Sequence, residues 1–270
     1  MPALPQRDLL DGLTRIASRA AAAIISIPYN DLDRREKRDR SPVTAADDAS
    51  EAVILNGLAQ LLPDVPVISE EAATRQKITV PGGRFLVVDP LDGTREFLAG
   101  LDEYTVNIAL VDEGLPVVGV IAAPARGLIW RGDVGMGAER LALTPGADLN
   151  AARQRSPIRT RTRPTNGIRV LLSRSHLDPA TDAYVDRLPG PQRVSCGSAL
   201  KFGLLAEGSA DVYPRLSPTS AWDVAAGHAV LTAAGGDMLT PGGESLHYRQ
   251  PGFLIPAFIA FGDRAAGRPR

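Results

Sequence analysis

A short apolar strand that runs directly into two aspartates constrains this chain most. Residues 85–88 read Phe-Leu-Val-Val, a β-rich run that predicts a buried strand. Asp89 and Asp92 follow it, with Pro90 between them. Because proline cannot extend a central strand, we expect the chain to leave the sheet at Pro90. Two carboxylates are therefore predicted on a tight turn at the carboxyl end of a strand.

The chemistry of this turn favours a cation next to an anion. Two carboxylates as close as Asp89 and Asp92 repel each other unless one keeps its proton or a cation lies between them. Hard oxygen ligands suit Mg²⁺ or Mn²⁺. Gly93 and Thr94 open a short helix expected over residues 95–99, so their amides can hold an anion such as phosphate. A polar turn with an N-cap aspartate accounts equally well for this motif taken alone.

Two other elements also carry an acid where a site would lie. The strand expected at 65–68 ends in Ser-Glu-Glu, and sites in α/β sheets gather at such strand ends. Glu70 is the candidate there, and Asp223 lies in the first turn of a helix expected over 222–235. A favourable helix-dipole interaction is the alternative explanation for both acids. His228 is expected to be a packed or exposed helix residue rather than a ligand, because no second histidine lies near it in sequence.

Asp47 is a carboxylate on the core-facing side of a helix. Thr44 is a good N-cap, and the helix is expected to run to about residue 62. Asp47 lies seven residues before Ile54, so it points toward the same side as the apolar stripe of Ile54 and Leu58. From this feature alone, capping by Asp47 is the favoured explanation of its position.

Composition limits the class of protein. The chain has 270 residues, 44% hydrophobic and 23% charged, with a net charge of −1, so no global field points to nucleic acid or a membrane. Its single cysteine, Cys196, excludes an intramolecular disulfide and fits a reducing compartment. No apolar run is long enough to span a bilayer. We expect a cytoplasmic protein, with peripheral association with the inner membrane left open.

The remaining pattern predicts two lobes, residues 1–150 and 151–270. The first is expected to hold a helix over 8–27 and antiparallel strands at 104–111, 116–122, 128–131 and 138–143. The second alternates strand and helix, with strands at 168–172, 210–213 and 258–261 and helices at 178–188, 198–207 and 222–235.

The stretch 145–167 is the expected connector between the lobes. It is polar, and it carries five arginines that an arm for nucleic acid would also carry. No aromatic residues lie between them for base stacking, which favours a solvated connector over nucleic-acid binding. The arginines are Arg153, Arg155, Arg159, Arg161 and Arg163.

Three motifs resemble the signatures of the inositol-monophosphatase superfamily. They are Ser69-Glu70-Glu71, Asp89-Pro90-Leu91-Asp92-Gly93-Thr94 and Trp222-Asp223-Val224-Ala225-Ala226-Gly227. Residues 41–47, 173–177, 197–202, 206–208 and 213–215 resemble most the bacterial 3′(2′),5′-bisphosphate nucleotidases of the CysQ type. The resemblance covers nearly the whole chain outside 145–167. It implies an α+β fold, an alternating α-β-α-β-α layered sandwich with the site between two lobes.

The resemblance also implies a phosphomonoesterase that uses two or three Mg²⁺ ions, accepts Mn²⁺ and is inhibited by Li⁺. The implied metal ligands are Glu70, Asp89, Asp92, Asp223 and the carbonyl of Leu91. The implied catalytic residues are Asp47 and Thr94, which orient and deprotonate the attacking water, together with Glu70. The implied substrate-binding residues are Gly93, Thr94, Lys37, Ser198, Lys201, Arg215 and Asp223.

The prediction of the substrate rests on Arg215. In the inositol phosphatases a glutamate near this position binds ring hydroxyls, whereas Arg215 suits a second phosphate. We therefore expect a phosphorylated nucleotide, 3′-phosphoadenosine 5′-phosphate or its sulfated relative, to lose its 3′-phosphate. The alternatives are a broader phosphatase for inositol phosphates or fructose 1,6-bisphosphate, and a sensor that binds a bisphosphate nucleotide without hydrolysis. We expect a monomer or a homodimer without an integral membrane segment.

Overall fold

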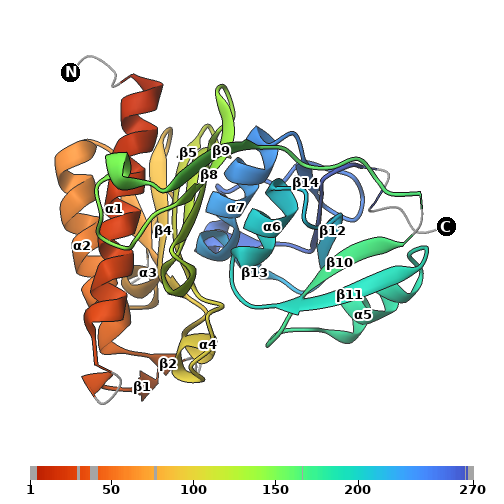
Figure 1. Ribbon diagram of the computed structural model, residues 1–270, viewed down its shortest axis with the longest axis horizontal. Helices are drawn as coiled ribbons and strands as arrows, with labels where there is room; N and C mark the ends of the chain where they lie inside the picture. The colour runs from red at the N-terminus through yellow and green to blue at the C-terminus, as the bar shows by residue number, and fades with distance from the viewer. Residues whose placement is uncertain are drawn as a thin grey trace.

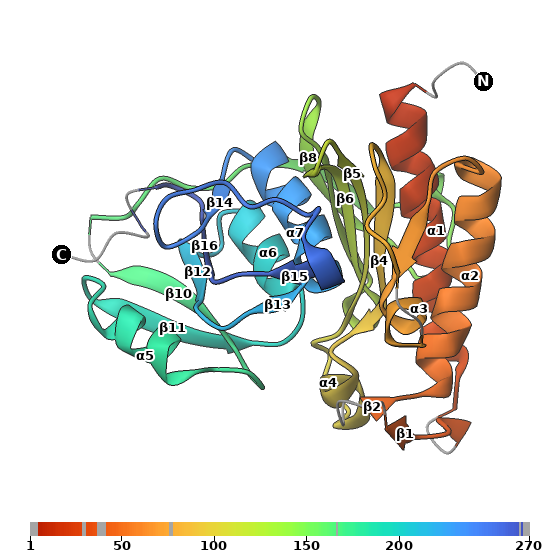
Figure 2. The same ribbon diagram turned by 180° about the vertical axis from the view of Figure 1, so that it is seen from behind.

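A computed structural model describes residues 5–28, 31–36, 42–75, 78–165, 167–264 and 266. Within them, helices and sheets alternate in five layers (Figure 1). Helices α1 (Gln6–Ser26) and α2 (Ala45–Leu61) cover one face of a seven-stranded sheet, and α6 (Leu200–Ala206) and α7 (Ala221–Ala233) cover its other face. A five-stranded sheet and then α5 follow, as the view from behind also shows (Figure 2). This order confirms the expected layered sandwich.

The outer helices are amphipathic in the way their sequences predict. α1 (Gln6–Ser26) and α2 (Ala45–Leu61) bury residues such as Leu13 and Ile54 against the sheet. The Thr44 hydroxyl accepts a hydrogen bond from the Ala46 amide, and Asp47 accepts from the Thr44 amide, so the expected capping box is present. Because one side of α2 faces the sheet, Asp47 is buried at its first turn.

The seven-stranded sheet has the order β3-β4-β5-β6-β7-β8-β9, in which only the β3–β4 pair is parallel. Its strands are β3 (Val67–Ser69), β4 (Phe85–Asp92), β5 (Thr105–Asp112), β6 (Leu115–Ala123), β7 (Leu128–Asp133), β8 (Gly137–Ala142) and β9 (Gln154–Ile158). The antiparallel strands predicted at 104–111 and 116–122 are confirmed, since β5 and β6 pair as a hairpin.

Two details of this sheet differ from the predictions. β4 does not end at Pro90: its ladder breaks after Asp89 and resumes at Asp92, opposite Thr105. The Pro90 carbonyl accepts instead from the buried Ser50 hydroxyl, at 2.7 Å, so the irregularity is satisfied from α2. β9 lies inside the stretch expected to be only a connector, and it was missed because its residues are mostly exposed on the sheet edge.

The second sheet has the order β11-β10-β12-β16-β14. Its strands are β10 (Ile168–Ser173), β11 (Pro191–Cys196), β12 (Val212–Arg215), β14 (Asp237–Leu239) and β16 (Phe258–Phe261), and its helices are α5 (Pro179–Asp186), α6 (Leu200–Ala206) and α7 (Ala221–Ala233). β10 is parallel to β11 and β12, whereas β16 is antiparallel to both neighbours. β11 and β14 were not predicted, since a mostly exposed strand and a three-residue strand carry little apolar pattern.

Shorter elements complete the described chain. They are α3 (Glu70–Arg75), α4 (Thr94–Leu98), the strand pairs β1 (Arg35–Glu36) with β2 (Pro42–Val43) and β13 (Thr219–Ser220) with β15 (Leu254–Ile255), and the 3-10 turns Pro124–Arg126, Leu149–Ala151 and Pro251–Phe253. Within the described part of the chain, no helix combines the length and apolarity needed to cross a bilayer.

Helix α7 belongs to the second half of the chain but packs directly on the first sheet, against β5 and β6. The contact is close: a Cβ atom added at Gly119 of β6 would lie 2.3 Å from the Ala226 carbonyl oxygen of α7. Backbone thus meets backbone, and small residues are required on both sides. This packing brings the first turn of α7, with Asp223, to the carboxyl end of β4.

Candidate active site

A cleft of about 260 Å³ lies between the two halves of the chain. Ten of the predicted site residues line it: Glu70, Asp89, Leu91, Asp92, Gly93, Thr94, Ser198, Lys201, Arg215 and Asp223. Asp47 lies directly behind Thr94, with its carboxylate within reach of the Thr94 hydroxyl. Lys37 lies outside the described residues.

The topology explains why the acids meet. β3 and β4 are parallel neighbours, so Glu70, which begins α3 after β3, and Asp89 of β4 come to the same edge of the sheet. The Asp89 side chain is buried, and its Oδ1 accepts from the Leu91 amide at 3.1 Å. Asp223 enters from the other half at the start of α7, where it accepts from the Ser220 amide and the Thr219 hydroxyl.

Thr94 connects the cleft to the buried Asp47. Its Oγ1 lies 3.3 Å from Asp47 Oδ1 and 3.2 Å from the Leu91 carbonyl oxygen. The other carboxylate oxygen of Asp47 is engaged by the amide and hydroxyl of Thr44, at 2.8 and 2.7 Å. A threonine hydroxyl has one proton to donate and two lone pairs. Thr94 lines the cleft, and when it donates to Asp47 its lone pairs are left to accept a proton.

The pKa of Asp92, a carboxylate of this cleft, is strongly perturbed. Burial, and after it the negative charge of Asp223, raise the pKa of Asp92 to about 7. The charge of Lys201 and hydrogen bonds from the Ala199 amide and the Asn107 side chain act in the opposite direction. A group that is costly to ionise beside a second acid favours a cation between the two.

The donor set fits a hard divalent cation. It consists of four carboxylates, on Glu70, Asp89, Asp92 and Asp223, and the carbonyl of Leu91, all lining one cleft. No group of three or more acid, histidine or cysteine side chains among the described residues is already arranged around a common point that would hold an ion. Each aspartate is instead held by hydrogen bonds to its own neighbourhood, so an ion would draw them together.

Lys201 is a buried side chain in the lining of the cleft. Its Nζ donates to the carbonyl oxygens of Cys196, at 3.3 Å, and Ser198, at 2.5 Å. The ammonium also lies 5.1 Å from the centre of the Tyr213 ring. Its charge is therefore fixed beside Asp92, and it ties down the turn that carries Ser198.

Arg215, on β12, faces the same cleft from the second sheet. Its Nε atom is buried and has no hydrogen-bond partner within the described part of the chain. A buried N–H donor without an acceptor is costly. Arg215 is thus placed to receive an anion from the cleft.

His176, Arg95, Trp222 and Asn107 are among the cleft residues and supports that sequence reasoning missed. His176 and Arg95 line the cleft, and partial burial lowers the pKa of His176, with the charges of Arg215 and Arg95 lowering it further. Trp222 adds an aromatic surface to the lining. Asn107 donates to Asp92 from β5 at 3.3 Å. The hairpin register could have identified Asn107, because it stands opposite Asp89.

The model of the inositol monophosphatase family matches residues 6–266. The chain belongs to this family. The resemblance found in the motifs is thereby confirmed over nearly the whole sequence.

Relatives within the family are similar along their full length. The chain is 40% identical to the 3′(2′),5′-bisphosphate nucleotidase CysQ of Escherichia coli K12 over 93% of this chain and 98% of that protein. It is 34% identical to the CysQ nucleotidase of Buchnera aphidicola over 90% of this chain and 88% of that one.

Two solved structures of the family share the fold. The CysQ of Bacteroides thetaiotaomicron matches with a TM-score of 0.81 and 33% identity, covering 98% of this chain and all of that one. An inositol monophosphatase from Anabaena matches with a TM-score of 0.74 and 26% identity, covering 97% and 93% of the two chains. Both matches extend across both sheets.

Proposed function

We propose that this chain is a 3′(2′),5′-bisphosphate nucleotidase, a phosphomonoesterase that converts 3′-phosphoadenosine 5′-phosphate to AMP and phosphate. The sulfated relative would lose its 3′-phosphate in the same way and give adenosine 5′-phosphosulfate. The observation that carries the proposal is that Arg215 shares one cleft with the acids and with the Thr94–Asp47 pair. The 40% identity to a nucleotidase supports the same substrate.

Mg²⁺ is the proposed metal, and its proposed ligands are Glu70, Asp89, Asp92, Asp223 and the carbonyl of Leu91. When bound, Mg²⁺ supplies charge neutralisation for the phosphate and a more acidic water. Two or three ions are proposed, with Mn²⁺ as a substitute and Li⁺ as an inhibitor. The support for this is the all-oxygen donor set and the raised pKa of Asp92.

Thr94 and Asp47 are proposed to remove the proton of the attacking water. The water would give its proton to Thr94 Oγ1 while the Thr94 proton moves to Asp47 Oδ1, 3.3 Å away. Asp47 is suited to this because Thr44 fixes its other oxygen. Glu70, which directly follows the carboxyl end of β3, is proposed to help orient the attacking water.

The phosphate that is cleaved is proposed to lie on the amides of Gly93 and Thr94. Gly93 has a φ of +91°, and a Cβ atom there would lie 2.9 Å from the Glu103 carbonyl oxygen, so glycine is needed for this turn. The second phosphate is proposed to lie on Arg215, whose Nε has no other partner among the described residues. The other proposed contacts come from Lys37, Ser198, Lys201 and Asp223.

Wider properties of the protein remain proposals. We propose a cytoplasmic enzyme, for which the single cysteine gives the support, and we propose a monomer or a homodimer. A first lobe of residues 1–150 and a second of 151–270 are proposed, with β9 of the second stretch completing the first sheet.

Phosphate release in the presence of Mg²⁺ tests the function. 3′-Phosphoadenosine 5′-phosphate, inositol 1-phosphate and fructose 1,6-bisphosphate are compared, with and without Li⁺. The expected result is a preference for the nucleotide of at least tenfold in kcat/KM, with inhibition by Li⁺. Equal turnover of the sugar phosphates would favour the broader phosphatase, and binding of the nucleotide without release would favour the sensor.

A further inference from the structure

A turn of the second half of the chain is held by two acids of the first half. This turn, residues 196–199, links β11 to α6. The Gly197 amide donates to Oε2 of Glu103 at 2.8 Å, and the Ala199 amide donates to Oδ2 of Asp92 at 2.7 Å. Glu103 lies before β5 and does not line the cleft, whereas Asp92 does. The same turn thus joins a remote acid to a site acid.

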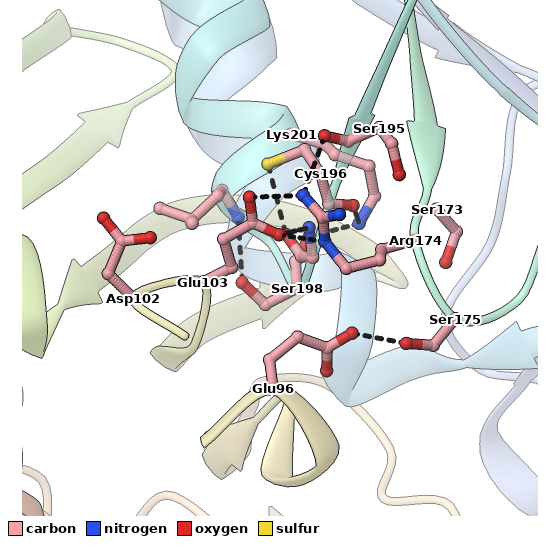
Figure 3. Close-up of polar contacts among 12 residues, drawn as sticks. Glu96, Asp102, Glu103, Ser173, Arg174, Ser175, Ser195, Cys196, Ser198 and Lys201 are labelled. Atoms are coloured by element: carbon pink, nitrogen blue, oxygen red, sulfur yellow. Dashed lines mark hydrogen bonds and ion pairs between the residues drawn. The ribbon is translucent and has the colours of Figure 1, made fainter. Parts of the chain in front are cut away.

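Arg174 locks Glu103 in place (Figure 3). Its Nε and Nη2 donate to the two carboxylate oxygens of Glu103 at 2.7 and 2.8 Å, a bidentate geometry. These hydrogen bonds hold the pKa of Glu103 below its ordinary value. The Arg174 side chain and amide also donate to the carbonyls of Ser195, at 3.3 Å, and Cys196, at 3.2 Å. Arg174 therefore links Glu103 to the end of β11.

The turn has no room to shift toward the first half of the chain. A Cβ atom added at Gly197 would lie 2.8 Å from the Glu103 carbonyl oxygen and 2.9 Å from Cγ of Glu96. Ser198 has a φ of +48°, a left-handed conformation that is held because its flanking amides are fixed on both sides. Between β10 and α5, Ser175 makes a separate contact between the two halves by donating to Glu96 (Figure 3).

We propose that Glu103 is a positioning residue for Asp92, acting through the Gly197–Ala199 turn. The inference rests on the proposed function, because Asp92 is a site acid there. Oδ2 of Asp92 receives two donors, the Ala199 amide and the Asn107 side chain. Without Glu103 to hold the turn, the Ala199 donor would be displaced, and the longer Asn107 contact alone would orient the carboxylate.

The same displacement would move Lys201. Its ammonium is bonded to the carbonyls of Cys196 and Ser198, at either side of Gly197. Glu103 thereby sets both the orientation of the Asp92 carboxylate and the position of the Lys201 ammonium beside it.

The test compares Glu103→Ala with Glu103→Gln and with Asp102→Asn as a matched control. Asp102 is the neighbouring acid; it pairs with Arg126 at 3.1 Å and points away from the turn (Figure 3). The first readout is the exchange rate of the Gly197 and Ala199 backbone amides by NMR, without substrate or metal. The second is the Mg²⁺ concentration that gives half-maximal phosphate release from 3′-phosphoadenosine 5′-phosphate, together with kcat and KM.

Glu103→Ala is expected to speed exchange of both amides at least tenfold and to raise the half-saturating Mg²⁺ concentration about tenfold, as removal of outer partners of a metal ligand does. Glu103→Gln keeps an acceptor for the Gly197 amide. Its amide exchange rates and half-saturating Mg²⁺ concentration are expected to be close to those of the wild type. Asp102→Asn is expected to match the wild type. Should Glu103→Ala not fold, Arg174→Gln, at a side chain that is 41% exposed, takes its place with changes in the same direction.

A merely structural role would lower the melting temperature and leave the Mg²⁺ dependence unchanged, and that result would overturn the proposal. Unchanged exchange at Ala199 would also overturn it. If the wild-type protein released no phosphate, the proposed function would fail, and the exchange rates would still decide whether Glu103 places the Ala199 amide.

Discussion

The hydroxyl of Thr94 lies 3.3 Å from Oδ1 of Asp47, although 47 positions of the chain separate the two residues. Thr94 begins α4 in the cleft, and Asp47 is buried in the first turn of α2. A carboxylate hidden behind a hydroxyl can take up a proton without contacting the substrate itself. The pair is therefore suited to act as one unit.

Thr94→Val keeps the shape of the side chain and removes its hydroxyl. We expect kcat to fall by about 10²–10⁴-fold, the usual contribution of general acid–base catalysis, with little change in KM. Asp47→Asn is expected to lower kcat by a similar factor. The double variant is expected to lower kcat no further than either single variant does. Asp48→Asn, at the next acid along α2, is the control and is expected to keep full activity. Additive losses in the double variant would contradict a single unit.

Arg215→Gln tests the second phosphate. A charge-assisted hydrogen bond contributes about 1.5–3 kcal/mol, so KM for 3′-phosphoadenosine 5′-phosphate is expected to rise about 10–100-fold. A substrate with one phosphate, such as inositol 1-phosphate, is expected to be hydrolysed as before. Arg215→Lys keeps the charge without the planar donor pair. Its KM for 3′-phosphoadenosine 5′-phosphate is expected to lie between those of the wild type and Arg215→Gln. Steady-state kinetics with both substrates measure the effect, and an equal loss on both would remove Arg215 from specificity.

His228 makes stability depend on pH. It is buried in α7 with its Nδ1 3.1 Å from the Tyr248 hydroxyl, and burial lowers its pKa to about 4. In the unfolded chain the imidazole of His228 takes up a proton near pH 6.5. The stability gained by burying this imidazole in its neutral form is therefore complete above that pH and is lost as the pH falls toward 4. Between pH 7 and 4.5 we expect wild type to lose about 2–3 kcal/mol more unfolding free energy than His228→Gln. Urea titrations followed by tryptophan fluorescence measure this, and His247→Gln, at an exposed histidine, is expected to behave as wild type.

Much of this fold and site follows from local pattern. The capping box at Thr44 and the core-facing position of Asp47 are predictable because helix periodicity fixes which side a residue takes. The glycine at 93 and the acids at 89 and 92 are recognisable because a tight turn at a strand end allows few alternatives. Motifs in the order of a known family then place Asp223 with them.

The remainder depends on contacts between distant segments. Nothing around Glu103 indicates that it meets Arg174, 71 positions away, or the amide of Gly197. β9 and β11 are edge strands, and their residues are mostly exposed, so no alternation of apolar residues marks them. The prediction that the chain leaves the sheet at Pro90 was wrong because the Pro90 carbonyl, at the break in β4, accepts a hydrogen bond from Ser50, a residue of another element.

The acids of the cleft should cost the protein stability when no metal is bound. Asp92→Asn removes a charge that burial and Asp223 disfavour, and the asparagine oxygen can still accept from Ala199. We expect the metal-free variant at pH 8 to be about 1–2 kcal/mol more stable than wild type, and to release no phosphate. Mg²⁺ is expected to raise the melting temperature of wild type more than that of the variant. Thermal unfolding with and without chelator measures both, and a less stable variant would contradict the expected repulsion.

The packing of α7 on β6 joins stability to activity. A methyl group at Gly119 would meet the Ala226 carbonyl at 2.3 Å, and backbone cannot rotate away as a side chain can. Gly119→Ala is therefore expected to lower the unfolding free energy by about 3 kcal/mol, at the upper end of overpacking costs. Because α7 carries Asp223 one turn from Ala226, its displacement should also lower kcat in the fraction that remains folded. Gly82→Ala, where no atom lies within 4 Å of the added methyl, is the control and is expected to change stability by less than about 1 kcal/mol. A Gly119→Ala protein as stable and active as this control would show that α7 can move on the sheet without disturbing the site.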